Sequence, residues 1–342
     1  MTSKGPAIAI DAMGGDRAPR EVVRGAILAA REQPEVPLIL AGDEARVREE
    51  LRLGEWSGSN IEVVHSKNVI DMTDSPVEAL RRKKDSSIEV ATRLVKDGRA
   101  FSVVGAGNTG ACVAASTLLL GLLPDVKKAG IAVAFITGDT RVVVIDVGAN
   151  VAAKPEHLIQ YGIMASIYAR GILGVDRPRV GLLNIGEEEK KGNTLVKSSH
   201  ALFQKSRLNY VGNVEGVELF RGVCDVVVCD GFVGNIVLKT SEGMAERLIG
   251  LFHQVLGEAI DAESRGAALG RTLREAMGRL EKKLDYSEYG GAPLLGVDGV
   301  TIIAHGRSDA RAIYNAIRMA RRMGELDLNS RISEELRALT AA

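Results

Sequence analysis

The sequence predicts a three-layer α/β/α fold built on a largely parallel sheet with an antiparallel edge. Short apolar, β-branched runs alternate with segments of helical periodicity, which is typical of parallel strands covered by helices on both faces. The 342 residues, 46% of them hydrophobic, can fill one large domain or two lobes, and we treat residues 1–342 as a single α/β unit because no linker divides them. The strand candidates are residues 7–11, 37–41, 61–65, 101–105, 131–136, 142–147, 180–184, 225–230 and 300–304.

The antiparallel edge is predicted from the segment AFITGDTRVVVI. Gly138 and Asp139 lie between two strand candidates and leave no room for a crossover helix. A Gly-Asp pair in that position favours a tight hairpin turn. We therefore expect these two strands to pair antiparallel at an edge of the sheet.

Charge and cysteine content exclude several classes of protein. Lys and Arg number 44, and so do Asp and Glu, so no global field attracts nucleic acid or an anionic membrane. Cys112, Cys224 and Cys229 cannot form a complete disulfide framework, and each lies in an apolar context that favours packing over reactivity. The uncharged run 101–124 is long enough to span a bilayer, but a buried strand, a glycine-rich loop and a buried helix explain it better. We expect a cytoplasmic protein.

Glycines, amides and carboxylates follow five of the strand candidates. Because the carboxyl ends of parallel strands meet at one edge of a sheet, we expect these loops to form one ligand-binding rim. Each loop alone has a simpler explanation, since Gly, Asn and Asp are common in any strand-to-helix turn. The residues in question are Asp11, residues 105–110, residues 148–150, Asn184 and residues 231–235.

The loop GAGNTGA predicts an anion site. Three glycines and a hydroxyl open a helix, so backbone N–H groups can face a phosphate. The spacing also matches GxGxxG, but the acidic residue that a dinucleotide site needs about 20 positions later is absent, and the chain has no GxxxxGK[ST] motif. A small anion or the phosphate of a larger ligand therefore fits best. The residues concerned are Gly105, Gly107, Asn108, Thr109 and Gly110.

Two further segments carry charged candidates. Arg81 begins four consecutive cations, which are either a solvated helix face or a site in which Arg81 reaches an anionic group. His305 follows the last strand candidate, so we expect it on the same rim. The five histidines include no HExxH and no close pair, and GxSxG is absent, so neither a metal site nor a nucleophilic triad is expected.

Several motifs together resemble one family, the bacterial phosphate acyltransferases that use acyl-acyl carrier protein. They occur in the family's order between about residues 7 and 322: IAIDAMGGDRAP, RRKKDSSIEVATRLVKDGRA, VGAGNTGA, VIDVGANV, LLNIGEEEKKG, VCDGFVGNIVLKTSEG and IAHGRSDARA. The resemblance implies that inorganic phosphate attacks the thioester of acyl-acyl carrier protein and releases acyl phosphate for phospholipid synthesis. It also implies a fold similar to phosphotransacetylases and isopropylmalate dehydrogenases, and a homodimer that associates peripherally with membrane.

This chemistry requires no enzyme nucleophile, metal or cofactor. Phosphate is itself an anionic nucleophile, and a thiol with a pKa of about 8.5 is a tolerable leaving group. The protein must hold phosphate against the carbonyl and supply donors to the developing oxyanion, so direct attack without a covalent enzyme intermediate suffices. The expected polar participants are Asp230, Asn235, Lys239 and His305, with Asn108, Asn150 and Asn184 as further donors.

The glycine pair after the first strand candidate is expected to shape the site rather than to take part in the chemistry. Gly14 and Gly15 permit close backbone approach or a positive φ, and we expect them to line the phosphate and thioester region. Asp11 and Asp16 would repel a dianion if they faced it. We therefore interpret the MGGD turn as a wall beside the phosphate cradle rather than the cradle itself.

Residues 241–285 predict a protruding pair of amphipathic helices with a break at 264–266. Their apolar positions recur at spacings of three and four, which is consistent with packing against a partner subunit. The resemblance adds peripheral membrane contact through about residues 252–274, where Arg265, Arg271 and Arg274 could meet anionic lipid or the acidic carrier protein.

Alternative functions remain open from the residues alone. Within enzymes, the chain could be a phosphotransacetylase acting on acyl-coenzyme A or a dehydrogenase of related fold. Outside enzymes, it could be a non-catalytic scaffold that binds the carrier protein at the membrane. Phosphate-dependent release of the carrier thiol from long-chain acyl-acyl carrier protein, without nicotinamide turnover, separates the phosphate acyltransferase from both enzyme alternatives. A scaffold would bind the acyl carrier protein without forming acyl phosphate.

Overall fold

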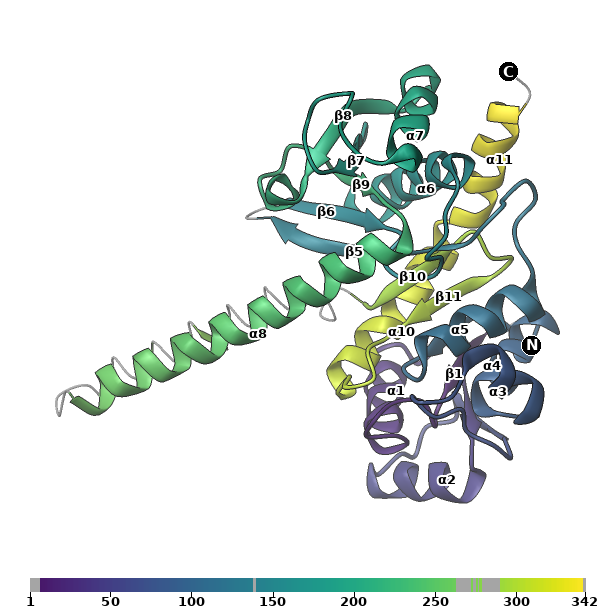
Figure 1. The fold of residues 1–342 in the computed structure, drawn as a ribbon. Helices are drawn as coiled ribbons and strands as arrows, with labels where there is room; N and C mark the ends of the chain where they lie inside the picture. The colour runs from purple at the N-terminus through teal and green to yellow at the C-terminus, as the bar shows by residue number, and fades with distance from the viewer. Residues whose placement is uncertain are drawn as a thin grey trace.

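The computed structural model describes residues 7–137, 140–262, 272, 275, 277–278 and 290–340. Within these residues, the strands form one continuous sheet of eleven strands in the order β3-β2-β1-β4-β11-β10-β5-β6-β9-β7-β8 (Figure 1). Most strands are apolar along their whole length because helices cover both faces of the sheet. The strands are β1 (Ala7–Asp11), β2 (Leu38–Gly42), β3 (Ile61–His65), β4 (Ala100–Gly105), β5 (Gly130–Thr137), β6 (Thr140–Ile145), β7 (Arg179–Asn184), β8 (Asn209–Glu215), β9 (Val226–Val228), β10 (Ala292–Leu295) and β11 (Val300–Ile303).

The three-layer, largely parallel architecture is confirmed, and the antiparallel pairing lies inside the sheet. β5 and β6 pair antiparallel from Ala132 with Ile145 to Thr137 with Thr140, as the sequence predicts. β10 then pairs antiparallel with both β5 and β11. The expectation of an antiparallel edge is therefore wrong in position. The C-terminal strands β10 and β11 return to the middle of the sheet and join β4 to the hairpin, a long-range pairing that local sequence does not reveal.

This central reversal divides the sheet into two halves. In the first half, β3, β2, β1, β4 and β11 run parallel to one another. In the second half, β6, β9, β7 and β8 run parallel to one another but opposite to the first half. The expectation that all five loops share one rim is therefore wrong, because the strands of the two halves end at opposite edges of the sheet.

The helices cover the two faces of the sheet unequally. One apolar core lies under α1, α2, α6, α7, α10 and α11, and the other lies under α3, α4, α5 and the beginning of α8. The second face is the one that carries the candidate site. The helices are α1 (Arg20–Glu32), α2 (Glu44–Leu53), α3 (Pro76–Arg82), α4 (Ser87–Lys96), α5 (Thr109–Ala115), α6 (Pro155–Tyr168), α7 (Thr194–Lys205), α8 (Gly231–Ala262), α10 (Ala310–Glu325) and α11 (Leu328–Thr340), with short π-helical segments η1 (Ser116–Leu120) and η2 (Ala169–Leu173) and a 3-10 helix η3 (Gly216–Phe220).

The helix α8 projects away from the body of the molecule (Figure 1). It begins directly after β9 and continues for 32 residues, which corresponds to about 48 Å. The predicted amphipathic helix over the first part of 241–285 is therefore one continuous element that begins ten residues earlier, at Gly231. The predicted break at 264–266 and most of the predicted second helix lie outside the described residues.

The uncharged run 101–124 forms β4, a loop, α5 and η1, in agreement with its interpretation as buried globular structure. Across the part of the chain that the structure describes, no helix is both long enough and apolar enough to cross a membrane.

Candidate active site

A cavity of about 260 Å³ lies on the second face of the sheet, between α5 and the beginning of α8. Its floor is apolar and comes from the central strands β5, β10 and β11. Its walls come from both halves of the sheet, so loops that end at opposite edges meet across the sheet face. The lining residues are Thr109, Gly110, Ile131, Val133, Val147, Gly148, Val151, Gly231, Phe232, Asn235, Leu238, Lys239, Ala292, Ile303, Ala304 and His305.

The glycines after β1 and β4 pack the turns of the first half tightly together. A Cβ atom on Gly14 would lie 2.7 Å from Asp11 Oδ2 and 2.7 Å from the backbone N of Gly107. Gly15 has φ +110°, a conformation that side chains disfavour. The backbone N–H of Asp16 donates to the carbonyl of Gly306 at 2.8 Å, which links this turn to the loop after β11. Gly14, Gly15 and Gly107 thus shape the support behind the cavity and are not among its lining residues.

Asn108 is occupied by structural hydrogen bonds. Its Oδ1 accepts the backbone N–H of Ala111 at 3.0 Å and caps α5, while its Nδ2 donates to the carbonyls of Asp71, Met72 and Asp74. Both polar atoms of the Asn108 side chain therefore have hydrogen-bond partners within the protein. The next residues, Thr109 and Gly110, line the cavity at the first turn of α5, where a helix leaves its N–H groups without an intrahelical partner.

Asp146 organises the loop after β6. Its carboxyl is fully buried and accepts the backbone N–H groups of Ile131, Gly148 and Ala149 at 2.9–3.0 Å. Burial raises the pKa of Asp146, and these hydrogen bonds oppose that rise because they stabilise the carboxylate. Asn150 turns inward, with its Nδ2 donating to the Ala129 carbonyl at 2.5 Å and contacting the Tyr161 hydroxyl at 2.9 Å. Gly148, rather than Asn150, lines the cavity.

The first two turns of α8 bring side chains from the second half of the sheet to the cavity. Asp230 accepts the backbone N–H groups of Phe232 and Val233, both at 3.0 Å, and so caps the helix. Asn235 and Lys239 lie four residues apart on one face of α8 and both line the cavity. Asp230 itself is thus placed as a structural cap, with its side chain directed at the helix N-terminus.

Lys239, Glu242 and His305 form the charged centre of the site. Lys239 Nζ lies 2.7 Å from Glu242 Oε2 and 3.4 Å from His305 Nε2. The backbone N–H of Arg307 donates to His305 Nδ1 at 3.2 Å, which assigns the proton of the neutral ring to Nε2. Lys239 Nζ, also a donor, therefore approaches Nε2 at 3.4 Å without a hydrogen bond to it. Burial lowers the pKa of His305, and the Lys239 cation lowers it further. Both effects favour the neutral ring, in which Nε2–H is the hydrogen-bond donor.

Glu242 was not among the residues that the sequence singled out. Only 15% of its side chain is exposed, and within the described structure its Oε1 is buried without a hydrogen-bond partner. Its position three residues after Lys239 on the same helix was the available signal. The carboxylate holds Lys239 at the cavity, and Arg307 forms a second contact with α8 through Glu246 at 2.5 Å.

Two predicted binding residues lie apart from the cavity. Asn184 uses its side chain within its own turn, where Oδ1 accepts the N–H of Ile185 at 2.9 Å and Nδ2 donates to the Lys191 carbonyl at 3.3 Å. Arg81 is exposed on α3. Gly105 supports α5 from behind, since a Cβ there would lie 2.9 Å from Cys112 Sγ.

The three cysteines lie in the interior and are not among the residues that line the cavity. Cys112, Cys224 and Cys229 are buried, and burial raises the pKa of each thiol. Across the described residues, no group of three or more His, Cys, Asp or Glu side chains is arranged to hold a metal ion.

Comparison with known proteins connects this geometry to a family. The model of a family described as "Fatty acid synthesis protein" matches residues 7–331. A curated phosphate acyltransferase from Desulforamulus reducens is 48% identical over 329 residues, which cover 96% of this chain and 97% of that protein. The chain belongs to the phosphate acyltransferase family. The family match over residues 7–331 includes every residue that lines the cavity.

Solved structures show the same fold in phosphotransacetylases. One from Streptococcus pyogenes superposes with a TM-score of 0.61 at 17% sequence identity, covering 94% of this chain and 95% of that one. Another, from Staphylococcus aureus, has a TM-score of 0.57 at 18% identity, covering 93% and 94% of the two chains. The fold class predicted for this phosphate acyltransferase family member, including its similarity to phosphotransacetylases, is therefore confirmed.

Proposed function

We propose that the protein transfers a fatty acyl group from acyl-acyl carrier protein to inorganic phosphate and so forms acyl phosphate for phospholipid synthesis. The observation that supports this most directly is the cavity that joins the start of α5 to Lys239 and His305 over an apolar floor. A cation and helix N–H groups suit phosphate, and the apolar floor suits the thioester end of an acyl chain. The family membership of the chain supports the same reaction.

The proposed mechanism is direct displacement. A phosphate oxygen attacks the thioester carbonyl, the carbonyl becomes a tetrahedral oxyanion, and the C–S bond breaks to release the carrier thiol. Lys239 and the N–H groups of Thr109 and Gly110 hold phosphate, while His305 Nε2–H donates to the oxyanion or the departing sulfur. Asn235, which lies beside Gly148 and one turn before Lys239 on α8, donates a further hydrogen bond to the substrate.

The wild-type reaction tests this proposal. Purified protein with palmitoyl-acyl carrier protein and inorganic phosphate is expected to release free carrier thiol and acyl phosphate at a rate that saturates with phosphate. Acyl phosphate is measured as hydroxamate and the thiol with a chromogenic disulfide. Turnover of palmitoyl-coenzyme A in preference to the carrier substrate would instead identify a phosphotransacetylase. Binding of the carrier without acyl phosphate at any phosphate concentration would identify a non-catalytic scaffold.

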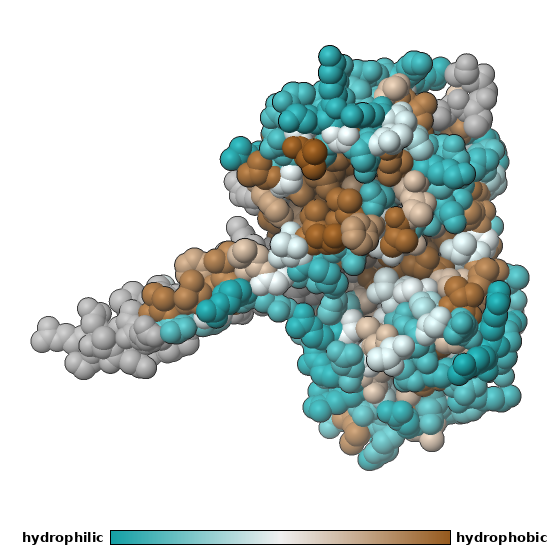
Figure 2. Space-filling model, in the orientation of Figure 1, coloured by the Kyte–Doolittle hydropathy of each residue, from teal (hydrophilic) through white to brown (hydrophobic). Residues whose placement is uncertain are grey.

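We further propose that the protein works as a cytoplasmic homodimer that contacts the membrane through α8. Apolar side chains are exposed on η3 and on the first turns of α8, where Val217, Phe220, Phe232 and Ile236 are each at least 47% exposed. Figure 2 shows apolar surface over β5 and β6 and continuing along α8. Burial of the part near the body between two subunits would leave the outer part of α8 for lipid.

The membrane contact predicts a mutational effect. Leu248, Leu251, Phe252 and Val255 form an exposed apolar stripe at helical spacing on α8. Replacing Leu251, Phe252 and Val255 by serine is expected to weaken binding to anionic phospholipid vesicles at least about tenfold, because each apolar side chain contributes about 1.5–3 kcal/mol on burial. Vesicle co-sedimentation measures this, and Leu53→Ser on α2, where Leu53 is 59% exposed, is the matched control. Unchanged binding of a folded triple variant would contradict the proposal.

A further inference from the structure

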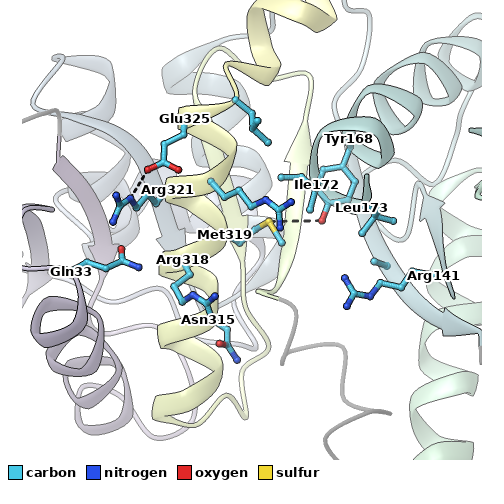
Figure 3. Close-up of a pocket in the computed structure, with 13 residues that line it drawn as sticks. Gln33, Arg141, Tyr168, Ile172, Leu173, Asn315, Arg318, Met319, Arg321 and Glu325 are labelled. Atoms are coloured by element: carbon cyan, nitrogen blue, oxygen red, sulfur yellow. Dashed lines mark hydrogen bonds and ion pairs between the residues drawn. The ribbon is translucent and has the colours of Figure 1, made fainter. Parts of the chain in front are cut away.

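A second cavity, of about 570 Å³, lies on the opposite face of the sheet from the candidate active site (Figure 3). Ala134 of β5 lines this cavity, whereas Ile131 and Val133 of the same strand line the active-site cavity. Because successive side chains of a strand point to opposite faces, the sheet itself separates the two spaces. α10 and the end of α1 form one wall of the second cavity, and β5, β6, the end of α6 and η2 form the other.

One part of the lining is apolar. Tyr168, Ile172, Leu173, Met319 and Leu326 contribute side chains, and the Tyr168 hydroxyl lies 4.0 Å from Met319 Sδ at the base of the cavity. Figure 3 shows Tyr168, Ile172 and Leu173 on the η2 side, facing Met319 on α10. A ligand that fills this cavity therefore needs an apolar body.

The remaining lining is strongly cationic. Arg141, Arg318, Arg321 and Arg322 contribute four guanidinium groups, against the single carboxylate of Glu325. Arg321 is neutralised, because its Nη1 lies 2.6 Å from Glu35 and its Nε lies 2.6 Å from Glu325. This concentration of cations is local, since the whole chain has equal numbers of acidic and basic residues.

Two of these arginines retain their hydrogen-bonding capacity. Arg318 and Arg322 lie one turn apart on α10. Arg318 lies over the ring of Tyr314 at 5.4 Å, and among the described residues no carboxylate pairs with either guanidinium group. Arg141 extends from β6 toward α10 on the other side of the gap (Figure 3). Guanidinium groups in such an arrangement suit the oxygens of a phosphate, which they bind in a bidentate manner.

We propose that this cavity is a binding site for a phosphomonoester with a compact apolar body, distinct from the site of phosphate acylation. Arg318, Arg322 and Arg141 bind the phosphate, and the apolar body packs against Tyr168, Ile172 and Met319. The volume falls in the range of small-molecule sites, about 300–1,000 Å³. The ligand would bridge α10, which begins just after the His305 turn, and β6, which leads into the Asp146 turn. Occupancy is therefore expected to alter the apparent KM of the active site across the sheet.

Calorimetric titration of the full-length protein with phenyl phosphate tests the proposal. We expect one bound molecule per chain in this cavity, with the affinity reduced at least about tenfold in Arg318→Gln/Arg322→Gln and unchanged in Arg48→Gln, an exposed arginine on α2. Lys239→Ala is expected to leave this binding intact, because Lys239 belongs to the other cavity. Arg141→Gln provides a second variant, on the opposite wall, that is expected to weaken binding.

Other outcomes would overturn the assignment. Full affinity in a folded Arg318→Gln/Arg322→Gln variant would exclude the cavity, and loss of binding in Lys239→Ala would move the ligand to the active site. Inorganic phosphate is titrated in parallel into Lys239→Ala. If it bound as tightly as phenyl phosphate, the apolar wall would contribute nothing, and the site would be one for free anions rather than phosphomonoesters.

Discussion

Replacing Lys239 by alanine is expected to lower kcat/KM for acyl phosphate formation about 100- to 1,000-fold, because the variant loses the cation that the cavity presents to phosphate. The loss should appear mainly as a higher KM for phosphate. Arg247→Ala, another exposed cation on α8, is the matched control and should keep wild-type rates. Full activity of Lys239→Ala in a folded protein would contradict the placement of the site.

The same centre allows a sharper test through His305. His305→Gln should retain more activity than His305→Ala, because a glutamine amide can replace the Nε2–H donor.

The Lys239 cation lowers the pKa of His305 and the Glu242 carboxylate raises it. The pKa of His305, followed by NMR, should therefore rise in Lys239→Ala and fall in Glu242→Gln. Glu242→Gln should also raise the KM for phosphate, because the Glu242 carboxylate no longer holds the Lys239 ammonium in position at the cavity. A His305 pKa that is the same in all three proteins would exclude this coupling.

Replacing Gly234 by alanine is expected to destabilise the protein by at least about 3 kcal/mol, measured as the free energy of unfolding in urea. A Cβ at Gly234 would collide with the carbonyl oxygen of Asp146, and a backbone atom cannot rotate away as a flexible side chain can. The collision also pushes α8 away from the loop after β6. Activity should therefore fall in parallel, because Asn235 and Lys239 move with the helix.

Gly243→Ala is the control for this prediction. It lies on the same helix, but a Cβ there meets nothing within 4 Å. Alanine should stabilise the protein by about 0.5–1 kcal/mol at this position, through its higher helix propensity. If both substitutions had equal effects on the unfolding free energy, the contact between α8 and the Asp146 loop would not be as the structure has it.

The sequence was sufficient to predict nine of the eleven strands of the described structure. Apolar, β-branched runs marked the positions of all nine strand candidates, and AFITGDTRVVVI marked the hairpin. The strands β8, of seven residues, and β10, of four, were not identified. In β8, residues 209–215 (NYVGNVE) are partly polar and partly exposed. β10 has only four residues, 292–295, and it lies between β11, which is close in sequence, and β5, which is distant. The local pattern of apolar residues predicts a strand poorly where pairing with residues elsewhere in the chain determines that strand.

The candidate site was predictable only in part. Lys239, Asn235, His305, Thr109 and Gly110 do come together in one cavity. The amides of Asn108, Asn150 and Asn184 instead bond within the protein, as does the carboxylate of Asp230. Asn and Asp follow strands both where ligands bind and where turns need caps, so residue type alone does not separate the two roles.

By itself, the sequence determined most of the alternation of strands and helices, the glycine turns and the apolar periodicity of the exposed helix, because these depend on local periodicity and backbone preference. Only the tertiary structure decided that β10 and β5 reverse the sheet at its centre, that loops from opposite edges meet over one face, and that Glu242 holds Lys239 near His305. The physical reason is that strand pairing and the contact of Lys239 with His305 act between residues far apart in the chain. His305 and Lys239 are 66 residues apart, and nothing in their local sequence specifies the 3.4 Å contact between them.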